Sequence, residues 1–255
     1  MPHDRLERDA RPETATFIRH LEASDRTLSD EERQVIDEAI SHFIDVDADV
    51  DVVREHDRPT VSSLLVSGWA CRYNTLADGR RQILALHISG DFVDLHSFPM
   101  KRMDHSVATV TRCRFAIVPH ENLRRITEEH PHLTRQLWRS TLIDAAVLRQ
   151  WLLGAGQRSA IEHAAHLICE LYTRLRVVNL ADETSFQLPL TQTEIGDALG
   201  ISPVHTNRVI QELRRLELIS LRGSTVDILD WEGLLKLAEF DATYLGLEPN
   251  REATS

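Results

Sequence analysis

The sequence has few of the features that mark a secreted, membrane-spanning or thiolate-clustered protein. It contains three cysteines, Cys71, Cys113 and Cys169, which are widely separated and form no CxxC pair. That pattern argues against a disulfide framework and against a four-thiolate cluster within one chain. No stretch reaches the roughly 20 apolar residues that a membrane-spanning helix needs, and no hydrophobic signal core follows the N-terminus. We therefore expect a cytoplasmic protein with no membrane partner.

Catalytic sequence motifs are also absent. The chain has no P-loop, no GxSxG, no HExxH and no evident spacing of a nucleophile and its base. A length of 255 residues suits two domains. These observations predict a protein that is not an enzyme.

The negative charge is concentrated at one end of the chain. The formal net charge is −11, and residues 1–60 alone contain 17 Asp and Glu against 8 Lys and Arg. Residues 191–222 hold four acidic and four basic side chains. A locally neutral-to-basic face on an acidic protein can still engage phosphates. The net charge therefore does not exclude double-stranded DNA as a partner.

The N-terminal half changes from a polar segment to alternating strands. Residues 1–30 lack strong periodicity and predict a loose lead-in, after which Ser29 and Glu32 form a capping-box pattern for a short helix through Phe43. An acidic connector at residues 45–51 follows. Apolar and polar residues alternate from Thr60 to Pro119, interrupted by turns such as Asp78-Gly79. This region predicts a small antiparallel β-roll.

Helices follow Pro119. A long helix over residues 131–153 carries an apolar stripe at three- and four-residue spacing, formed by Trp138, Thr141, Ala145, Leu148 and Leu152. The stripe either pairs with a second copy or packs on the chain's own β-domain, and the pattern favours pairing. Gly154-Ala155-Gly156 predicts a helix break and an interdomain hinge. The expected domains are a β-roll sensor at 25–130, a dimerisation helix at 131–153, a DNA-binding domain at 157–230, and a C-terminal helix and tail at 231–255.

The most specific pattern lies at residues 190–229. Thr191 and Glu194 form a capping box, Gly196 allows a close helix crossing, and Gly200 ends the first helix. Ser202 and Pro203 then start a second helix, whose expected buried face consists of Thr206, Val209, Ile210 and Leu213. Two predicted strands, Leu218–Leu221 and Thr225–Leu229, lie around residues 222–224 and complete a winged helix-turn-helix.

The buried face of the second helix, residues 203–216, determines which side chains face outward. We expect its N-terminal end to enter the major groove and to read bases with Val204, His205, Asn207 and Arg208. The Arg208 guanidinium matches the O6 and N7 acceptors of guanine. Expected phosphate contacts are Gln192, Thr193, Ser202, Arg214, Arg215 and Arg222. For the three arginines a solvated surface position is an equal alternative.

Residues 190–202, with Arg208 and the sensor segments at 72–83 and 90–92, resemble the Crp/Fnr superfamily of bacterial transcription regulators. The resemblance implies an α+β fold: an N-terminal antiparallel β-roll similar to cyclic-nucleotide-binding domains, a long dimerisation helix and a C-terminal winged helix-turn-helix. It further implies a homodimer that binds a palindromic operator, contacts RNA polymerase and responds to a signal through the β-roll. The alternative is a nucleotide-binding sensor module that acts on a protein partner.

The resemblance places an effector pocket at Gly90, Asp91, Arg102 and Ser106. Cyclic-AMP-binding members carry a glutamate and an Arg-Ser/Thr-Ala segment here, whereas this chain has a displaced Arg102 with the acid Asp104 nearby. Since a carboxylate repels a phosphate, the sequence argues against cyclic AMP. The N-terminal cysteine group of iron–sulfur sensors is absent as well. The effector and any cofactor stay unknown.

Thirteen histidines raise the question of metal or haem binding. One set, His163, His166 and Cys169, shares a helix at three-residue spacing. A second set surrounds the sensor turn and consists of His87, His96, Met100 and His105. Because exposed or singly hydrogen-bonded histidines are more common than ligand sets, the sequence assigns no metal site.

Overall fold

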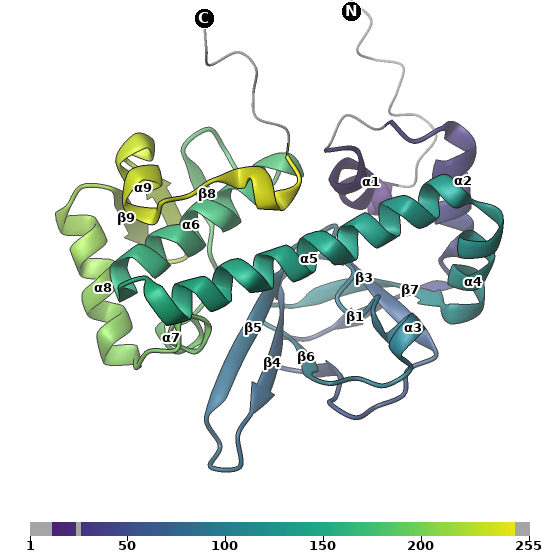
Figure 1. The fold of residues 1–255 in the computed structure, drawn as a ribbon, viewed down its shortest axis with the longest axis horizontal. Helices are drawn as coiled ribbons and strands as arrows, with labels where there is room; N and C mark the ends of the chain where they lie inside the picture. The colour runs from purple at the N-terminus through teal and green to yellow at the C-terminus, as the bar shows by residue number, and fades with distance from the viewer. Residues whose placement is uncertain (1–11, 24–26, 248–255) are drawn as a thin grey trace, which may run out of the picture. The chain divides into compact units, whose positions relative to one another are not determined.

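The computed structural model describes residues 12–23 and 27–247 (Figure 1). The predicted lead-in at 1–11 and 24–26 and the end of the predicted tail, 248–255, lie outside these residues. Contacts divide the chain into two compact units, Met1–Arg72 with Leu86–Leu142 and Tyr73–Ala85 with Ile143–Ser255. The predicted α+β fold is confirmed: antiparallel sheets come first, then one long helix, then a helix-turn-helix.

Two sheets form the β-roll. One has the order β1(His42–Val46)-β7(Cys113–Pro119)-β3(Val61–Ser67), and the other β2(Asp51–Val53)-β6(Ser106–Thr109)-β4(Ala70–Thr75)-β5(Arg81–His87). Alternate side chains of the strands turn inward, so that Leu65, Phe115 and Val107 are fully buried in one apolar cluster. The predicted hairpin turn is also confirmed, since Gly79 has a φ of +86° between β4 and β5.

Helices form at the N-terminal end of this unit, where the sequence predicted a loose lead-in, and that prediction is wrong. Part of the expected lead-in forms η1(Pro12–Thr14) and α1(Ala15–Glu22), and α1 buries Phe17, Ile18 and Leu21. The next helix, α2(Asp30–Ala39), has the predicted Ser29 capping box but ends before Phe43, which lies in β1. The expected acidic connector contains the end of β1 and the start of β2. An eight-residue helix is too short for its periodicity to stand out in a polar segment.

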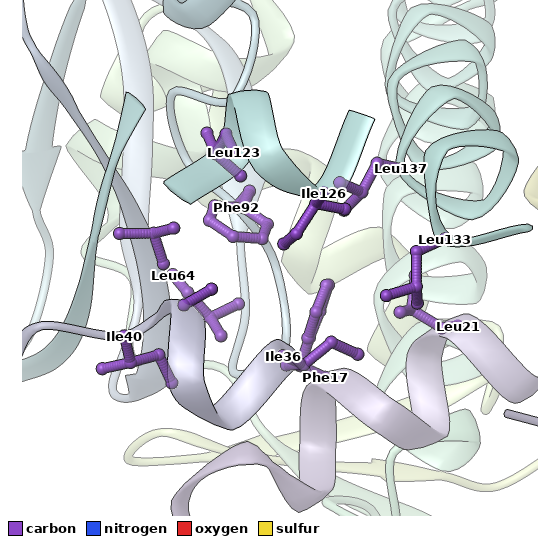
Figure 2. A pocket seen from close by; sticks show the side chains of 12 residues that line it. Phe17, Leu21, Ile36, Ile40, Leu64, Phe92, Leu123, Ile126, Leu133 and Leu137 are labelled. Atoms are coloured by element: carbon purple, nitrogen blue, oxygen red, sulfur yellow. The ribbon is translucent and has the colours of Figure 1, made fainter. Parts of the chain in front are cut away.

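These helices share an apolar core with α4(His120–Glu129) and the first turns of the long helix. Figure 2 shows Phe17 and Ile36 pointing toward Ile126 and Leu133 across it. The space left between the side chains is about 20 Å³, which is about what a single water molecule needs. We therefore interpret it as a packed core and not as a ligand cavity.

The long helix α5(Pro131–Gln157) passes through the expected hinge. The predicted helix break at residues 154–156 is wrong, because Gly154 and Gly156 both have helical backbone; an interdomain hinge there stays a prediction. Gly154 is where α5 meets α6(Ala160–Val177): a Cβ there would lie 2.4 Å from the His163 ring. The helix instead ends before Ser159, whose capping box with Glu162 starts α6. The glycine at 154 therefore allows α5 and α6 to pack closely.

The two glycines give a matched test of this interpretation. We expect Gly154→Ala to lower the free energy of unfolding by about 1–3 kcal/mol through overpacking against His163. Gly156→Ala should be neutral or raise stability by up to about 1 kcal/mol, since nothing lies within 4 Å of the added Cβ and alanine is the better helix former. Urea unfolding of both variants measures the difference. Equal effects at the two positions would contradict the packing role.

The second unit contains β8(Ser185–Gln187), α7(Gln192–Leu199), α8(Pro203–Arg215), β9(Ile219–Arg222), β10(Thr225–Ile228), α9(Trp231–Ala238) and η2(Ala242–Leu245). The three strands form an antiparallel sheet in the order β8-β10-β9. The fully buried Glu170 of α6 accepts hydrogen bonds from Trp151 Nε1 at 3.2 Å and from the Tyr244 hydroxyl at 2.8 Å. This carboxylate thereby connects α5, α6 and η2.

No helix within the described residues combines the length and apolar character needed to cross a membrane.

Candidate DNA-binding surface

Helix α7 begins and ends where its capping residues predict. The Thr191 hydroxyl accepts a hydrogen bond from the Glu194 amide at 3.2 Å, and Glu194 Oε2 accepts one from the Thr191 amide at 2.7 Å. These two bonds satisfy amides that the first helical turn leaves without partners. At the other end Gly200 has a φ of +70° and closes the helix. Both predicted ends of the first helix are confirmed.

Helix α8 crosses α7 closely because of Gly196. A Cβ at this position would lie 2.7 Å from the Ile201 carbonyl oxygen and 3.0 Å from Thr206 Oγ1. The Ser202 hydroxyl accepts a hydrogen bond from the His205 amide at 3.3 Å, and Pro203 occupies the first helical position. The predicted inner face of α8 is buried, with Thr206 and Leu213 fully inaccessible. The tight turn and the close crossing thus set which face of α8 points outward.

The outward face of α8 carries the four residues predicted to read bases. Val204 is 65% exposed. His205 and Arg208 are exposed, and Asn207 is half-buried. A valine methyl suits the thymine methyl group, and a guanidinium suits the guanine edge. The structure thus brings the four side chains to one helix face, and base reading by them stays a prediction.

The residues predicted to contact phosphate differ in how free they are to do so. Gln192, Thr193 and Ser202 are exposed at the N-termini of α7 and α8, where the helix dipoles favour an anion. Arg214 and Arg222 are exposed as well, the latter beside the wing turn. By contrast, Arg215 donates two hydrogen bonds to Glu212, at 2.6 and 2.8 Å. Arg215 is therefore the weakest of the predicted phosphate contacts.

The predicted dimer stripe is accessible along α5. The exposed fractions of Trp138, Leu148 and Leu152 are 64%, 46% and 72%. Ala145 is exposed and Thr141 half-buried. The inward face of the same helix holds Leu133, Leu137, Val147 and Trp151, all buried. Leu142, which follows Thr141 and is 55% exposed, was not among the predicted stripe residues. Apolar side chains thus line α5 on two faces, one of them buried and the other largely exposed.

The four residues of the predicted effector pocket make contacts with different segments. A Cβ on Gly90 would lie 2.9 Å from the Thr16 carbonyl oxygen of α1, so this turn packs on α1. Asp91 Oδ2 accepts a hydrogen bond from the Ile88 amide at 3.0 Å. Ser106 Oγ accepts one from the Glu55 amide at 3.0 Å, and Arg102 is exposed. An effector pocket at these four positions stays a prediction.

A buried carboxyl group, Asp94, lies near the same turn. Burial raises its pKa to about 7, against the opposing influence of its hydrogen bond from Ser63 and of the Arg72 charge. Its Oδ1 atom accepts the Ser63 amide at 2.6 Å. Since the folded chain holds this proton more tightly than the unfolded chain, the associated stability is full below about pH 4 and is lost as the pH rises through about 7.

Asp94→Asn is expected to remove this pH dependence. Asparagine keeps the acceptor for the Ser63 amide and carries no charge, as the protonated acid does. The melting temperatures of variant and wild type should be most alike near about pH 3.5, where the acid is largely protonated in the folded and the unfolded chain, and the variant should melt at the higher temperature near about pH 8. Calorimetry at both pH values measures the difference. A difference that does not change with pH would show that Asp94 does not titrate in this range.

Two histidines of the predicted set around the sensor turn, His96 and His105, lie close together in the structure. Within the described residues, the one group of three or more His, Cys, Asp or Glu side chains with converging ligand atoms is His96, Asp104 and His105. The other proposed set does not converge: His163 packs on Gly154, and the His166 ring stacks on Tyr244 at 5.8 Å. Met100 is 67% exposed. Asp104 and His96 are too far apart in the chain to form a local sequence motif, so the sequence did not connect them.

The comparisons with known proteins agree with this arrangement. The cyclic nucleotide-binding domain family matches residues 44–130, and the Crp-like helix-turn-helix domain family matches residues 162–237. The transcriptional activator protein FnrL of Cereibacter sphaeroides is 29% identical over 230 residues, which are 88% of this chain and 91% of that protein. The nitrogen fixation regulation protein FixK of Bradyrhizobium diazoefficiens is 29% identical over 184 residues, 70% of this chain and 74% of that protein.

Solved structures show the same fold. FixK2 from Bradyrhizobium japonicum superposes with a TM-score of 0.71 at 23% identity, over 77% of this chain and 96% of that chain. A CooA mutant from Carboxydothermus hydrogenoformans superposes with a TM-score of 0.63 at 13% identity, over 77% of this chain and 87% of that chain. At these identities the likeness concerns the fold alone.

Proposed function

This chain belongs to the Crp/Fnr superfamily of bacterial transcription regulators, and on that premise we propose that it acts as a homodimer that reads a two-fold-symmetric operator with helix α8. That it is a DNA-binding regulator and not an enzyme follows from its two domain families and from relatives that are transcriptional activators. The dimer, the operator symmetry and the roles of single residues are our proposal.

The observation that carries the proposal is the outward face of α8. Val204, His205 and Arg208 are exposed at the N-terminal end of a helix whose opposite face is buried in its own domain. The helix-turn-helix places this end of the second helix in the major groove. Arg208 reads guanine there, and Val204 contacts a thymine methyl. Gln192, Thr193 and Ser202 hold the adjacent phosphates through helix N-termini.

The dimer follows from the second face of α5. Trp138, Leu148 and Leu152 form an exposed apolar stripe at the spacing of a helix pair. Pairing of two copies through this stripe gives a two-fold axis, and a symmetric protein requires a symmetric operator. In this proposal the β-roll receives an effector, the dimer contacts RNA polymerase as family members do, and the protein works in the cytoplasm.

A genomic-fragment selection tests the proposal. Purified full-length protein is mixed with sheared DNA from its source organism, and the retained fragments are sequenced. We expect fragments from upstream of transcription starts that share a two-fold-symmetric motif. Retention without a shared motif would mean that the protein binds only phosphates. A motif without symmetry would contradict the homodimer.

A further inference from the structure

Three side chains of the first unit converge beside the short helix α3(Ser97–Met100). His96 immediately precedes α3, whereas Asp104 and His105 immediately precede β6. One ligand atom from each side chain lies within 4.8 Å of the other two. The two imidazole rings face each other with centroids 4.7 Å apart and a tilt of 39°. The fold thus assembles two nitrogens and one oxygen at one place.

We propose that His96, Asp104 and His105 bind one divalent transition-metal ion, for which Zn²⁺ is the representative. Imidazole is a preferred ligand of Zn²⁺, Cu²⁺, Fe²⁺ and Ni²⁺, and a carboxylate oxygen completes a three-ligand set. Three protein ligands leave a position for water or for an exogenous group. The sequence identifies no effector, and in this proposal the effector is a metal ion.

The burial of His105 supports this assignment. Its residue is 5% exposed, and its Nε2 atom has no hydrogen-bond partner among the described residues. A buried polar nitrogen of this kind requires an explanation, and an ion is one. Its Nδ1 atom lies 2.7 Å from Asp104 Oδ1. The Asp104 carboxylate thus lies against His105 and supplies the third ligand atom of the set.

The geometry requires only a small closure. Metal–ligand distances of about 2.0–2.2 Å place tetrahedral ligand atoms about 3.3 Å from one another, so the present spread must shrink by an ångström or two. The Asp104 side chain is 79% exposed, and its Oδ1 atom already lies 2.7 Å from His105 Nδ1. Because Asp104 is exposed, the site is open to solvent on this side, and an ion can enter there.

The surrounding charges select the kind of cation. Asp104 contributes one negative charge, whereas the Arg72 guanidinium is close enough to act electrostatically on His105 and opposes a cation. Hard cations such as Mg²⁺ and Ca²⁺ need several oxygen ligands and receive one here. An ion that binds imidazole strongly overcomes the Arg72 charge, and Mg²⁺ does not. Magnesium therefore serves as the negative control.

A regulatory role for the ion rests on the proposed function, but its binding does not. The test is therefore a binding measurement without DNA, whose failure would leave the DNA-reading proposal untouched. Full-length protein is stripped with a chelator and titrated with Zn²⁺ in competition with a chromophoric chelator. Parallel samples receive Mg²⁺, or Co²⁺ as a spectroscopic probe. The variants are His96→Gln, Asp104→Asn and the matched control His42→Gln, whose histidine is exposed on β1.

We expect one Zn²⁺ per chain in wild type and in His42→Gln, with no binding of Mg²⁺. Affinity should fall at least about 10-fold in His96→Gln and in Asp104→Asn. The Co²⁺ form should show visible d–d absorption without a thiolate charge-transfer band, which excludes the cysteines as ligands. Asp104 is exposed, so Asp104→Asn stays folded and keeps the test decisive. Absent Zn²⁺ binding, or equal Zn²⁺ affinity in all variants, would overturn the proposal.

Discussion

Replacing Leu148 and Leu152 together with glutamate is expected to produce a monomer that binds a symmetric operator at least about 100-fold more weakly than wild type. Both side chains belong to the exposed apolar stripe of α5 and contribute little to the core of their own chain. Four like charges at a two-fold helix pair repel each other across a short distance. Without pairing, each monomer binds one half-site independently. The covalent or non-covalent linkage of two binding modules raises their affinity about 10²–10⁴-fold, and the monomer loses this gain.

Leu76→Glu with Leu180→Glu is the matched control. These leucines are 58% and 45% exposed, are not part of α5, and the double variant carries the same charge change. Sedimentation equilibrium gives the oligomeric state, circular dichroism shows whether each variant is folded, and fluorescence anisotropy gives operator affinity. If the α5 variant remained a dimer with wild-type affinity, the stripe would not be the interface.

Arg208→Ala is expected to lower the affinity for the operator about 30-fold or more. One bidentate arginine–guanine contact is worth about 1–3 kcal/mol, and a dimer makes the contact twice. The loss should be confined to operators that carry the guanine. On a duplex with that base pair replaced in both half-sites, wild type and variant should bind equally well.

Arg214→Ala separates base reading from charge neutralisation. If this exposed arginine contacts phosphate, its loss weakens binding to all sequences alike and lowers the salt slope by about 1. Anisotropy titrations at several salt concentrations measure both quantities. Equal weakening of Arg208→Ala on every duplex would mean that Arg208 contacts the backbone and reads no base.

The DNA-binding end of this protein was predictable because its determinants are local in the chain. Thr191, Gly196 and Gly200 each impose a cap, a close crossing or a turn on their immediate neighbours, and the structure has all three. The outward face of α8 then follows from helical geometry alone. The wing strands were placed to within one residue at their ends.

The features that sequence reasoning missed depend on contacts between distant segments. Helix α1 is stabilised by burying Phe17 against a core that later helices supply. Gly154 was interpreted as a hinge because nothing nearby in the chain shows that His163 would pack on it. His96 meets His105 through the fold of the α3–β6 segment, and Asp104 had been considered only as a charge that repels phosphate.

Selection of bound duplexes from a random pool is the most direct test of the central claim that two copies of α8 read DNA. Full-length protein, pure and without DNA, is mixed with the pool, and bound sequences are amplified over several rounds. The account predicts a two-fold-symmetric motif with half-sites centred about 10 base pairs or a multiple thereof apart, and with a guanine in each half-site that the Arg208→Ala protein no longer selects. An enriched pool without symmetry, or no enrichment at all, would contradict it.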